Sequence, residues 1–453
     1  MNLQERDKAV IWHPFTAFKH APEPIPIISG EGVYLVDENG NRYIDAISSW
    51  WVNLHGHANP YIAEKIYEQA KTLEQVIFAG FTHVPAIALA ERLLPKLPGE
   101  FSKIFYSDNG STATEVAVKM ALQFWWNGED AAGGAMGPAD NKPSVIYNKL
   151  PVTSKNKTRK KVLAFSNSYH GDTFGAMSVS DRSIFTQPFN DKLFEVIFID
   201  TPTEENIHRI KETIEERGVE TAAFIYEPLL QGAGGMRMYE AGLLDEILHT
   251  VKQHNIICIA DEVMTGFGRT GKLFASEYCQ QKPDIICLSK GLTGGTMALG
   301  VTAVAQHIVD AFVSDNRLKT FFHGHSFTAN PLACTASLAS LDLLEKESCQ
   351  QNIQQIVTLN AAFINQLKNN AQPLPVKNLR QLGTVLAFEL EQGKDGYLNN
   401  ISAHITQKGL SKGVYIRPLG NTVYIMPPYC ITSAQLQKTH SVIKEIIIDT
   451  QAL

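Results

Sequence analysis

Two residues with complementary chemistry stand at the ends of short apolar runs. Asp261 follows the run Ile256–Ala260, and Lys290 follows Ile285–Leu288 after a single serine. A lysine amine can form a Schiff base with an aldehyde cofactor. A carboxylate can keep a pyridine nitrogen protonated, which makes the ring withdraw electrons. The pair therefore matches the two groups that pyridoxal 5'-phosphate requires, although a surface lysine and a helix-capping aspartate would give the same pattern.

A third segment could bind the phosphate of such a cofactor. Asp108–Thr112 lies between a predicted strand, Lys103–Ser107, and a predicted helix, Ala113–Trp126. The start of a helix offers free N–H groups and the positive end of its dipole to an anion. Gly110 allows close approach of the backbone, and Ser111 and the following threonine add hydroxyls. Ser and Thr are also common as ordinary helix caps, so this reading stays open.

The elements that would position these residues alternate between strands and helices. Helix-like stretches such as Ile207–Arg217 separate apolar runs without polar alternation, which indicate a sheet buried on both faces. We predict an α/β fold with a mostly parallel sheet. The predicted strands are Lys103–Ser107, Val162–Ser166, Val196–Ile199, Ala222–Tyr226, Ile256–Ala260 and Ile285–Leu288. Ligands of open α/β sheets bind outside the carboxyl ends of strands, where this sequence places Asp108, Glu227, Asp261 and Lys290.

The rest of the chain departs from this alternation in two places. Residues Asn127–Lys161 are rich in Gly, Ala and Pro and end in a basic cluster, so we predict a long surface loop. From about residue 340 the sequence becomes more helical and includes a β-rich patch, Val414–Met426. This pattern predicts a second, smaller α+β domain.

Two further motifs suggest other functions and are set aside. Gly266–Gly271 spells G-x-G-x-x-G, but five residues separate it from the preceding strand, and the next strand ends in Lys290 instead of an acid. A nicotinamide dehydrogenase is therefore less favoured than a pyridoxal enzyme. The pairs His55/His57 and His323/His325 lack the additional ligands of a zinc site, so we predict no metal ion.

Composition limits the class of protein. Forty Lys and Arg against forty-six Asp and Glu give a net charge of -6, which argues against nucleic-acid binding. No apolar run approaches the roughly 18 residues that a membrane span requires. The six cysteines form no C-x-x-C pair, and the first residues have no signal-peptide core. We expect a cytoplasmic protein that is not attached to a membrane.

The motif residues also resemble a known family. Ile259–Ala275 and Pro283–Gly295 are similar to the class III, or subgroup II, aminotransferases of pyridoxal-phosphate fold type I, and the likeness extends over nearly the whole chain. This resemblance implies a large domain at residues 56–335. It implies a small domain formed by both termini, residues 1–55 and 336–453.

A narrower likeness concerns the substrates. Six other segments resemble family members that convert 8-amino-7-oxononanoate to 7,8-diaminononanoate in biotin biosynthesis, with S-adenosylmethionine as the expected donor. These segments are Ile11–Thr16, Ser48–His57, Phe78–Glu91, Ser168–Asp181, Glu227–Tyr239 and Ile416–Tyr429. Another class III ω-aminotransferase and an enzyme that uses lysine as the donor remain alternatives. So do an aminomutase and a non-enzymatic regulator of the same fold.

The resemblance implies roles for individual residues around the cofactor. Lys290 would hold it as a Schiff base and move the substrate proton, and Asp261 would pair with the pyridine nitrogen. Tyr169 would stack on the ring. Gly110 and Ser111 would bind the phosphate together with two residues from the partner subunit of a homodimer, His325 and Ser326.

Other residues would contact the substrate. Trp50 would line its pocket, Gly324 would touch it, and the planar guanidinium of Arg417 would bind a carboxylate through two hydrogen bonds. Weaker candidates for substrate contact are Arg269 and Tyr424.

The chain departs from the family pattern at three places. Phe15 stands where the family usually has tyrosine, so a hydroxyl is missing from the pocket. His325 replaces a proline in the phosphate-binding stretch, whereas Ser326 keeps the hydroxyl of the usual threonine. The predicted loop 127–161 is longer than expected.

Overall fold

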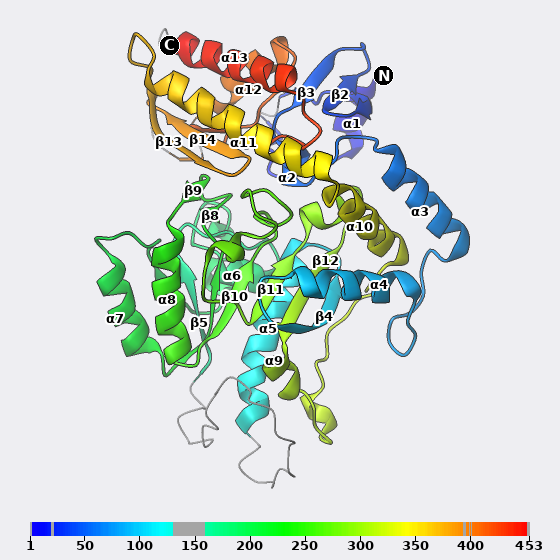
Figure 1. Ribbon diagram of the computed structural model, residues 1–453, viewed down its shortest axis with the longest axis vertical. Helices are drawn as coiled ribbons and strands as arrows, with labels where there is room; N and C mark the ends of the chain where they lie inside the picture. Colours follow the sequence, from blue (N-terminus) through cyan, green and yellow to red (C-terminus); the bar gives the residue numbers. More distant parts are fainter. Residues whose placement is uncertain are drawn as a thin grey trace.

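A seven-stranded sheet runs through the larger part of the protein (Figure 1). The computed structural model describes residues 2–19, 22–129, 159–392, 396–397, 399 and 401–450. The sheet order is β4 (Phe101–Ser107), β12 (Gly300–Ala305), β11 (Ile285–Leu288), β10 (Ile257–Asp261), β7 (Thr221–Tyr226), β5 (Lys161–Phe165) and β6 (Val196–Ile199). The strands from β11 to β6 are parallel, and β12 runs antiparallel to both β11 and β4. The mostly parallel α/β sheet is the fold that the sequence predicts.

Helices cover both faces of this sheet. Successive strand residues point to opposite faces, and because both sets are apolar, both faces are buried. Alternate strand residues pack with α5 (Gly110–Glu129) in one core. The residues between them pack in another core with α7 (Ile207–Arg217) and α8 (Ala241–Gln253). The remaining helices around the sheet are α4 (Val84–Leu93), α6 (Phe174–Val179), α9 (Gln306–Asp310) and α10 (Pro331–Leu344), and a short hairpin pairs β8 (Leu230–Gln231) with β9 (Arg237–Met238).

The two ends of the chain lie together, at the top of Figure 1. An antiparallel sheet of β13 (Val376–Leu382), β14 (Val385–Leu390) and β16 (Thr422–Ile425) belongs with α11 (Glu347–Lys368), α12 (Ile401–Ser411) and α13 (Ser433–Asp449). The amino-terminal part has α1 (Leu3–Val10), β1 (Ile27–Glu31), β2 (Tyr34–Asp37), β3 (Arg42–Asp45), α2 (Ser48–Trp51) and α3 (Pro60–Thr72). Strand β15 (Val414–Tyr415) pairs in parallel with β3 and joins the two ends. The domain boundaries at residues 56 and 335 stay a prediction.

The six predicted strands agree with observed strands within two residues at each end, and the predicted helix Ile207–Arg217 is α7. Strand β12 was not predicted. Of the predicted loop 127–161, residues 127–129 continue α5 and 159–161 lead into β5. The intervening part lies outside the described residues. Within the described residues, no helix is long and apolar enough to cross a membrane.

Candidate active site

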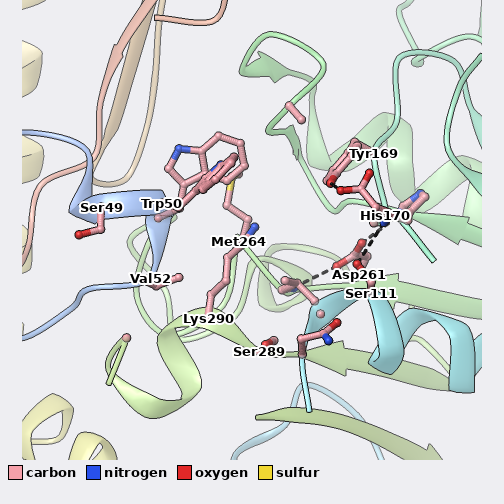
Figure 2. A pocket seen from close by; sticks show the side chains of 18 of the residues that line it. Ser49, Trp50, Val52, Ser111, Tyr169, His170, Asp261, Met264, Ser289 and Lys290 are labelled. Carbon is pink, nitrogen blue, oxygen red and sulfur yellow. Dashed lines mark hydrogen bonds and ion pairs between the residues drawn. The ribbon is translucent and has the colours of Figure 1, made fainter. Parts of the chain in front are cut away.

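A cavity of 820 Å³ opens at the carboxyl ends of β10 and β11 (Figure 2). Most residues that the sequence analysis selected line it: Trp50, Gly110, Ser111, Tyr169, Asp261, Lys290 and Arg417. Gly324, His325 and Ser326 do not line this cavity, and they lie in the segment that precedes α10. The structure therefore brings the predicted lysine, aspartate and helix start to one place within a single chain.

Lys290 lies two residues beyond β11, where it begins a short 3-10 helix with a left-handed φ of 45°. Its Nζ atom is 4.6 Å from the centre of the Trp51 ring. Burial lowers the pKa of the Lys290 amine to about 8, although the carboxylates of Asp261 and Glu227 partly oppose this shift. A substantial fraction of this amine is therefore neutral, and so nucleophilic, near pH 8.

Asp261 is the last residue of β10 and is only 5% exposed. One carboxylate oxygen lies 2.7 Å from Nδ1 of His170, and the other accepts the backbone N–H of Val263 at 3.1 Å. Because an ionised carboxylate only accepts hydrogen bonds, we assign the proton of this pair to His170 Nδ1. Figure 2 shows His170 directed at Asp261. Sequence reasoning missed His170, whose only signal is its place beside Tyr169.

Glu227 follows β7 and also lines the cavity. Its carboxylate accepts hydrogen bonds from the backbone N–H groups of Tyr169, at 3.2 Å, and Gly232, at 2.9 Å. Burial raises the pKa of Glu227 to about 7, and the nearby His170 opposes that rise. The sequence placed Glu227 at a strand end but assigned no role to it.

The start of α5 forms a cradle that suits a phosphate. A methyl group on Gly110 would lie 2.6 Å from Val263 Cγ1, and one on Gly171 would lie 2.1 Å from Ser111 Oγ. Both positions therefore exclude a side chain. The N–H groups of Thr112 and Ala113 donate to Asn109, so the amides of Gly110 and Ser111 are the ones that an anion could contact. The Thr112 hydroxyl, expected to help, instead donates to Asp108 at 2.8 Å and does not line the cavity.

Aromatic rings form much of the cavity wall. The ring of Phe15 lies 5.5 Å from Trp50 and 5.7 Å from Phe185, in edge-to-face contacts. The guanidinium of Arg417 lies 4.8 Å from the centre of the Trp50 ring. Phe185 was not predicted, because it lies in an irregular segment without a hydrophobic period. This wall combines an apolar surface with one cation, as a ligand with an apolar chain and a carboxylate would require.

The two weaker candidates have different surroundings. Tyr424 lines the cavity, and its hydroxyl accepts the indole N–H of Trp51 at 2.8 Å. Arg269 does not line the cavity and is only 1% exposed. Its guanidinium donates to the carbonyls of Pro427, Trp51 and Asn53 at 3.0 to 3.4 Å. Arg269 thus fixes the backbone behind the wall and does not face a substrate.

The two histidine pairs considered as possible metal ligands form hydrogen bonds with protein groups. His55 Nε2 lies 3.0 Å from the Ser340 hydroxyl, and His57 Nε2 lies 3.0 Å from Asp45. His323 Nδ1 lies 2.9 Å from the Lys119 amine.

The residues present fit pyridoxal phosphate. A buried amine, a buried carboxylate held by His170, and a glycine-lined helix start face one cavity. Tyr169 lies beside them, and its hydroxyl donates to Asp172 at 2.8 Å, so its ring has a fixed orientation. The cavity can therefore hold an anionic aromatic aldehyde beside a nucleophilic amine.

Comparisons with known proteins bear on this site. A family model described as aminotransferase class-III matches residues 16–447. The adenosylmethionine-8-amino-7-oxononanoate aminotransferase of Synechococcus elongatus is 44% identical over 96% of this chain and 98% of its own. The enzyme of that name from Helicobacter pylori is 38% identical over 99% of both chains.

Solved structures are similar over the same extent. The enzyme of that name from Methanocaldococcus jannaschii has a TM-score of 0.89 at 34% identity, over 99% of this chain and 98% of its own. An omega transaminase from Pseudomonas jessenii, solved in complex with PMP, has a TM-score of 0.87 at 24% identity, over 100% of this chain and 99% of its own. The second likeness concerns the fold alone.

Proposed function

The chain belongs to the class-III aminotransferases, and we propose that it transfers an amino group from S-adenosylmethionine to 8-amino-7-oxononanoate. The product is 7,8-diaminononanoate, an intermediate of biotin biosynthesis. One observation supports this proposal most strongly: Lys290 and Asp261 face a cavity whose wall combines aromatic rings with the Arg417 cation. Relatives named for this reaction align with almost the entire chain.

The family uses pyridoxal 5'-phosphate, and the mostly parallel sheet matches the expected fold type I. When bound, the cofactor supplies an aldehyde that condenses with amines and a ring that withdraws electrons from the substrate carbon. The cofactor calls for three kinds of protein group: an amine, a carboxylate and a phosphate cradle. We assign these roles to Lys290, Asp261 and the Gly110–Ser111 helix start.

Lys290 has two tasks in this proposal. Its amine would hold the cofactor covalently and, when free, would carry a proton on Nζ between the substrate carbon and the cofactor. A pKa lowered to about 8 keeps enough of the amine neutral to accept that proton. The 4.6 Å contact with Trp51 limits where Nζ can move.

Asp261 and its neighbours hold the other end of the ring. The Asp261 carboxylate would keep a proton on the pyridine nitrogen, and His170, 2.7 Å away, orients that carboxylate. Tyr169, whose hydroxyl is fixed by Asp172, would stack on the ring. Ser111 and the backbone of Gly110 would bind the phosphate at the start of α5.

Arg417 is the group we assign to the acceptor carboxylate. A guanidinium binds a carboxylate with two parallel hydrogen bonds, and stacking on Trp50 fixes the plane in which those bonds point. Trp50, Phe15 and Phe185 cover the apolar chain and exclude water. Phe15 offers no hydroxyl, so hydrogen bonding at this position plays no part in selecting the substrate.

We further propose that the active unit is a cytoplasmic homodimer. Gly324, His325 and Ser326 do not line the cavity of their own chain, which suits a role in the site of a partner subunit. The neighbouring Phe322 and Phe327 are 74% and 62% exposed, an apolar surface that a second copy would cover. A fully active monomer with full cofactor occupancy would contradict this assembly.

A screen of donors and acceptors on purified protein tests the substrate assignment. The protein is incubated with pyridoxal phosphate, 8-amino-7-oxononanoate and either S-adenosylmethionine, lysine or a simple ω-amine, and the diamine is quantified. We expect the diamine with S-adenosylmethionine. If lysine is the only donor that yields the diamine, lysine replaces S-adenosylmethionine as the assigned donor. If no donor yields the diamine but the protein transfers amino groups rapidly to another carbonyl acceptor, the assignment of 8-amino-7-oxononanoate is wrong and the family assignment still holds.

A further inference from the structure

The segment Ser48–Trp51 has a strained backbone at the wall of the active site. Ser48, Ser49 and Trp51 have left-handed φ values of 54°, 60° and 67°, although none of them is glycine. Side chains disfavour this conformation, and it persists only where surrounding contacts enforce it. Such contacts must therefore hold this turn in place.

The turn presents two adjacent tryptophans to two different parts of the site. Trp50 is 43% exposed, lines the cavity and stacks with Arg417 at 4.8 Å. Trp51 is 5% exposed, and its ring lies 4.6 Å from Lys290 Nζ. Figure 2 shows Ser49 and Trp50 on one segment beside Lys290. The conformation of this turn consequently sets the surroundings of both the catalytic amine and the substrate-binding cation.

Asp45 holds the N–H side of the turn. Its carboxylate is fully buried, at 0% exposure, and accepts hydrogen bonds from Ser49 N–H at 2.6 Å, Ser49 Oγ at 3.1 Å and Ile47 N–H at 3.3 Å. His57 Nε2 lies 3.0 Å from the same carboxylate. The Nδ1 atom of His57 lies 3.2 Å from the side-chain amide of Asn53. His57 therefore links Asp45, before the turn, to Asn53, after it.

Other groups hold the carbonyl side of the same segment. The buried guanidinium of Arg269 donates to the carbonyls of Trp51 and Asn53. The Ser48 hydroxyl donates to the carbonyl of Met426 at 2.7 Å. Inside the left-handed stretch, the N–H of Trp51 donates to the carbonyl of Ile47, whereas the N–H of Ser49 donates to Asp45. Loss of the Asp45 carboxylate therefore removes the restraint at Ser49.

We propose that Asp45 is a positioning residue for the aminotransferase reaction, because its carboxylate enforces the left-handed turn that places Trp50 beside Arg417 and Trp51 beside Lys290. It acts through these two tryptophans and does not line the cavity. This inference rests on the proposed function, since it assigns importance to Lys290 and Arg417 as parts of that site.

Asp45→Asn is the test, with Asp37→Asn as a matched control. Asn keeps the shape of the side chain, but its NH₂ group cannot accept a hydrogen bond, so one set of bonds is lost. Asp37 is also buried, at 4% exposure, and its carboxylate also accepts backbone and side-chain hydrogen bonds in the same sheet, from Asn41 and Tyr43. These hydrogen bonds join residues 39 to 43 and not the turn, so Asp37→Asn shows the effect of a general loss of stability.

The first measurement is hydrogen–deuterium exchange of the holoenzyme in the peptide that covers residues 46–54. Asp45→Asn should exchange there at least about ten-fold faster than wild type, because the amide of either Ile47 or Ser49 loses its acceptor and the turn is held less tightly. Asp37→Asn should leave that peptide unchanged. Equal exchange in wild type and Asp45→Asn would overturn the proposal, because Asp45 would not hold the turn. This measurement needs no substrate, so it is independent of the acceptor assignment.

The second measurement separates KM from kcat. Asp45→Asn should raise the acceptor KM about ten-fold, through Trp50 and Arg417, and lower kcat about ten-fold, through Trp51 and Lys290. Asp37→Asn should stay within about two-fold of wild type in both. Faster exchange without any kinetic change would overturn the proposal, as would equal kinetic losses in the two variants. If the screen identifies another acceptor, the same comparison is made with that acceptor.

Adding Ser49→Gly to Asp45→Asn provides a rescue test, and the milder variant Ser49→Ala guards against misfolding. Ser49→Gly relieves the left-handed strain, because glycine adopts positive φ freely. The double variant Asp45→Asn with Ser49→Gly should regain part of the lost kcat, and no recovery would contradict a role through the turn.

Ser49→Ala removes only one of the Asp45 bonds, folds with the backbone bonds intact, and should show a KM between those of wild type and Asp45→Asn. A KM equal to wild type would count against the proposal.

Discussion

Replacing Arg417 by alanine tests the assignment of the acceptor carboxylate. The guanidinium stacks on Trp50 at 4.8 Å, and among the described residues no carboxylate pairs with it. The Tyr415 side chain hydrogen-bonds the guanidinium, and the donors that this bond does not use are available to a substrate. A hydrogen bond to a charged group contributes about 1.5–3 kcal/mol, and this range corresponds to roughly 10- to 150-fold in affinity. Because the cavity is open to solvent, we expect the lower half of that range, an increase in acceptor KM of about 10- to 40-fold.

The assay is steady-state transfer to 8-amino-7-oxononanoate at saturating donor. Arg417 makes its contact at the carboxylate and not at the reacting carbon, so kcat should change less than KM. Arg417→Lys keeps the charge but loses the planar pair of donors, and its KM should lie between those of the wild type and Arg417→Ala. An acceptor ester that lacks the carboxylate charge should be used equally well by wild type and Arg417→Ala.

Two results would refute this reasoning. An unchanged KM in Arg417→Ala would show that another group binds the carboxylate. A lower kcat with an unchanged KM would show that Arg417 acts on the reacting centre, for example through Trp50, and not on the distant end of the substrate.

Three other perturbations follow from the same site. Asp261→Asn should lower kcat at least about 100-fold, because the pyridine nitrogen loses its anionic partner, and near wild-type turnover would contradict this role. Gly110→Ala should weaken retention of the cofactor during dialysis, because its methyl group would lie 2.6 Å from Val263 Cγ1 at the phosphate cradle; unchanged occupancy would argue against that cradle. The pKa of Lys290, lowered to about 8, gives a pH dependence for cofactor capture by cofactor-free protein. Only the neutral amine attacks the aldehyde, so the capture rate should rise with pH up to about 8 and level off above about 9, whereas an ordinary lysine would give a rate that still rises at pH 10.

The central pair could be predicted from sequence because its signal is local. Asp261 and Lys290 each follow a fully apolar run, and parallel strands deliver their carboxyl ends to the same edge of a sheet. The same logic located Glu227 and Asp108. Burial on both faces explains why these runs show no polar alternation, and why their bounds could be read to within two residues.

The missed residues depend on contacts between distant segments. Phe185 reaches the cavity from a segment without helical or strand periodicity, and His170 acts through a residue 91 positions away in the chain. The resemblance suggested Arg269 for substrate contact, whereas in the structure its Nη1 and Nη2 atoms donate to backbone carbonyls. Sequence reveals the type of such groups but not the direction in which they point.

The strained turn was the least predictable feature. Ser48–Trp51 contains neither Gly nor Asn, the residues that usually mark left-handed backbone. Its conformation depends on Asp45, which ends a four-residue strand too short to stand out in the sequence. The resemblance selected Trp50 for the pocket, but only the structure relates Trp50 and Trp51 to Arg417 and Lys290.

Mass spectrometry after borohydride reduction tests the central claim most directly. The holoenzyme is reduced, digested and searched for the peptide that carries the phosphopyridoxyl group. We predict the group on Lys290, in the peptide that follows Ile285–Leu288, and its complete absence in Lys290→Ala. Modification of a different lysine, or a reducible link that persists with normal turnover in Lys290→Ala, would contradict the account.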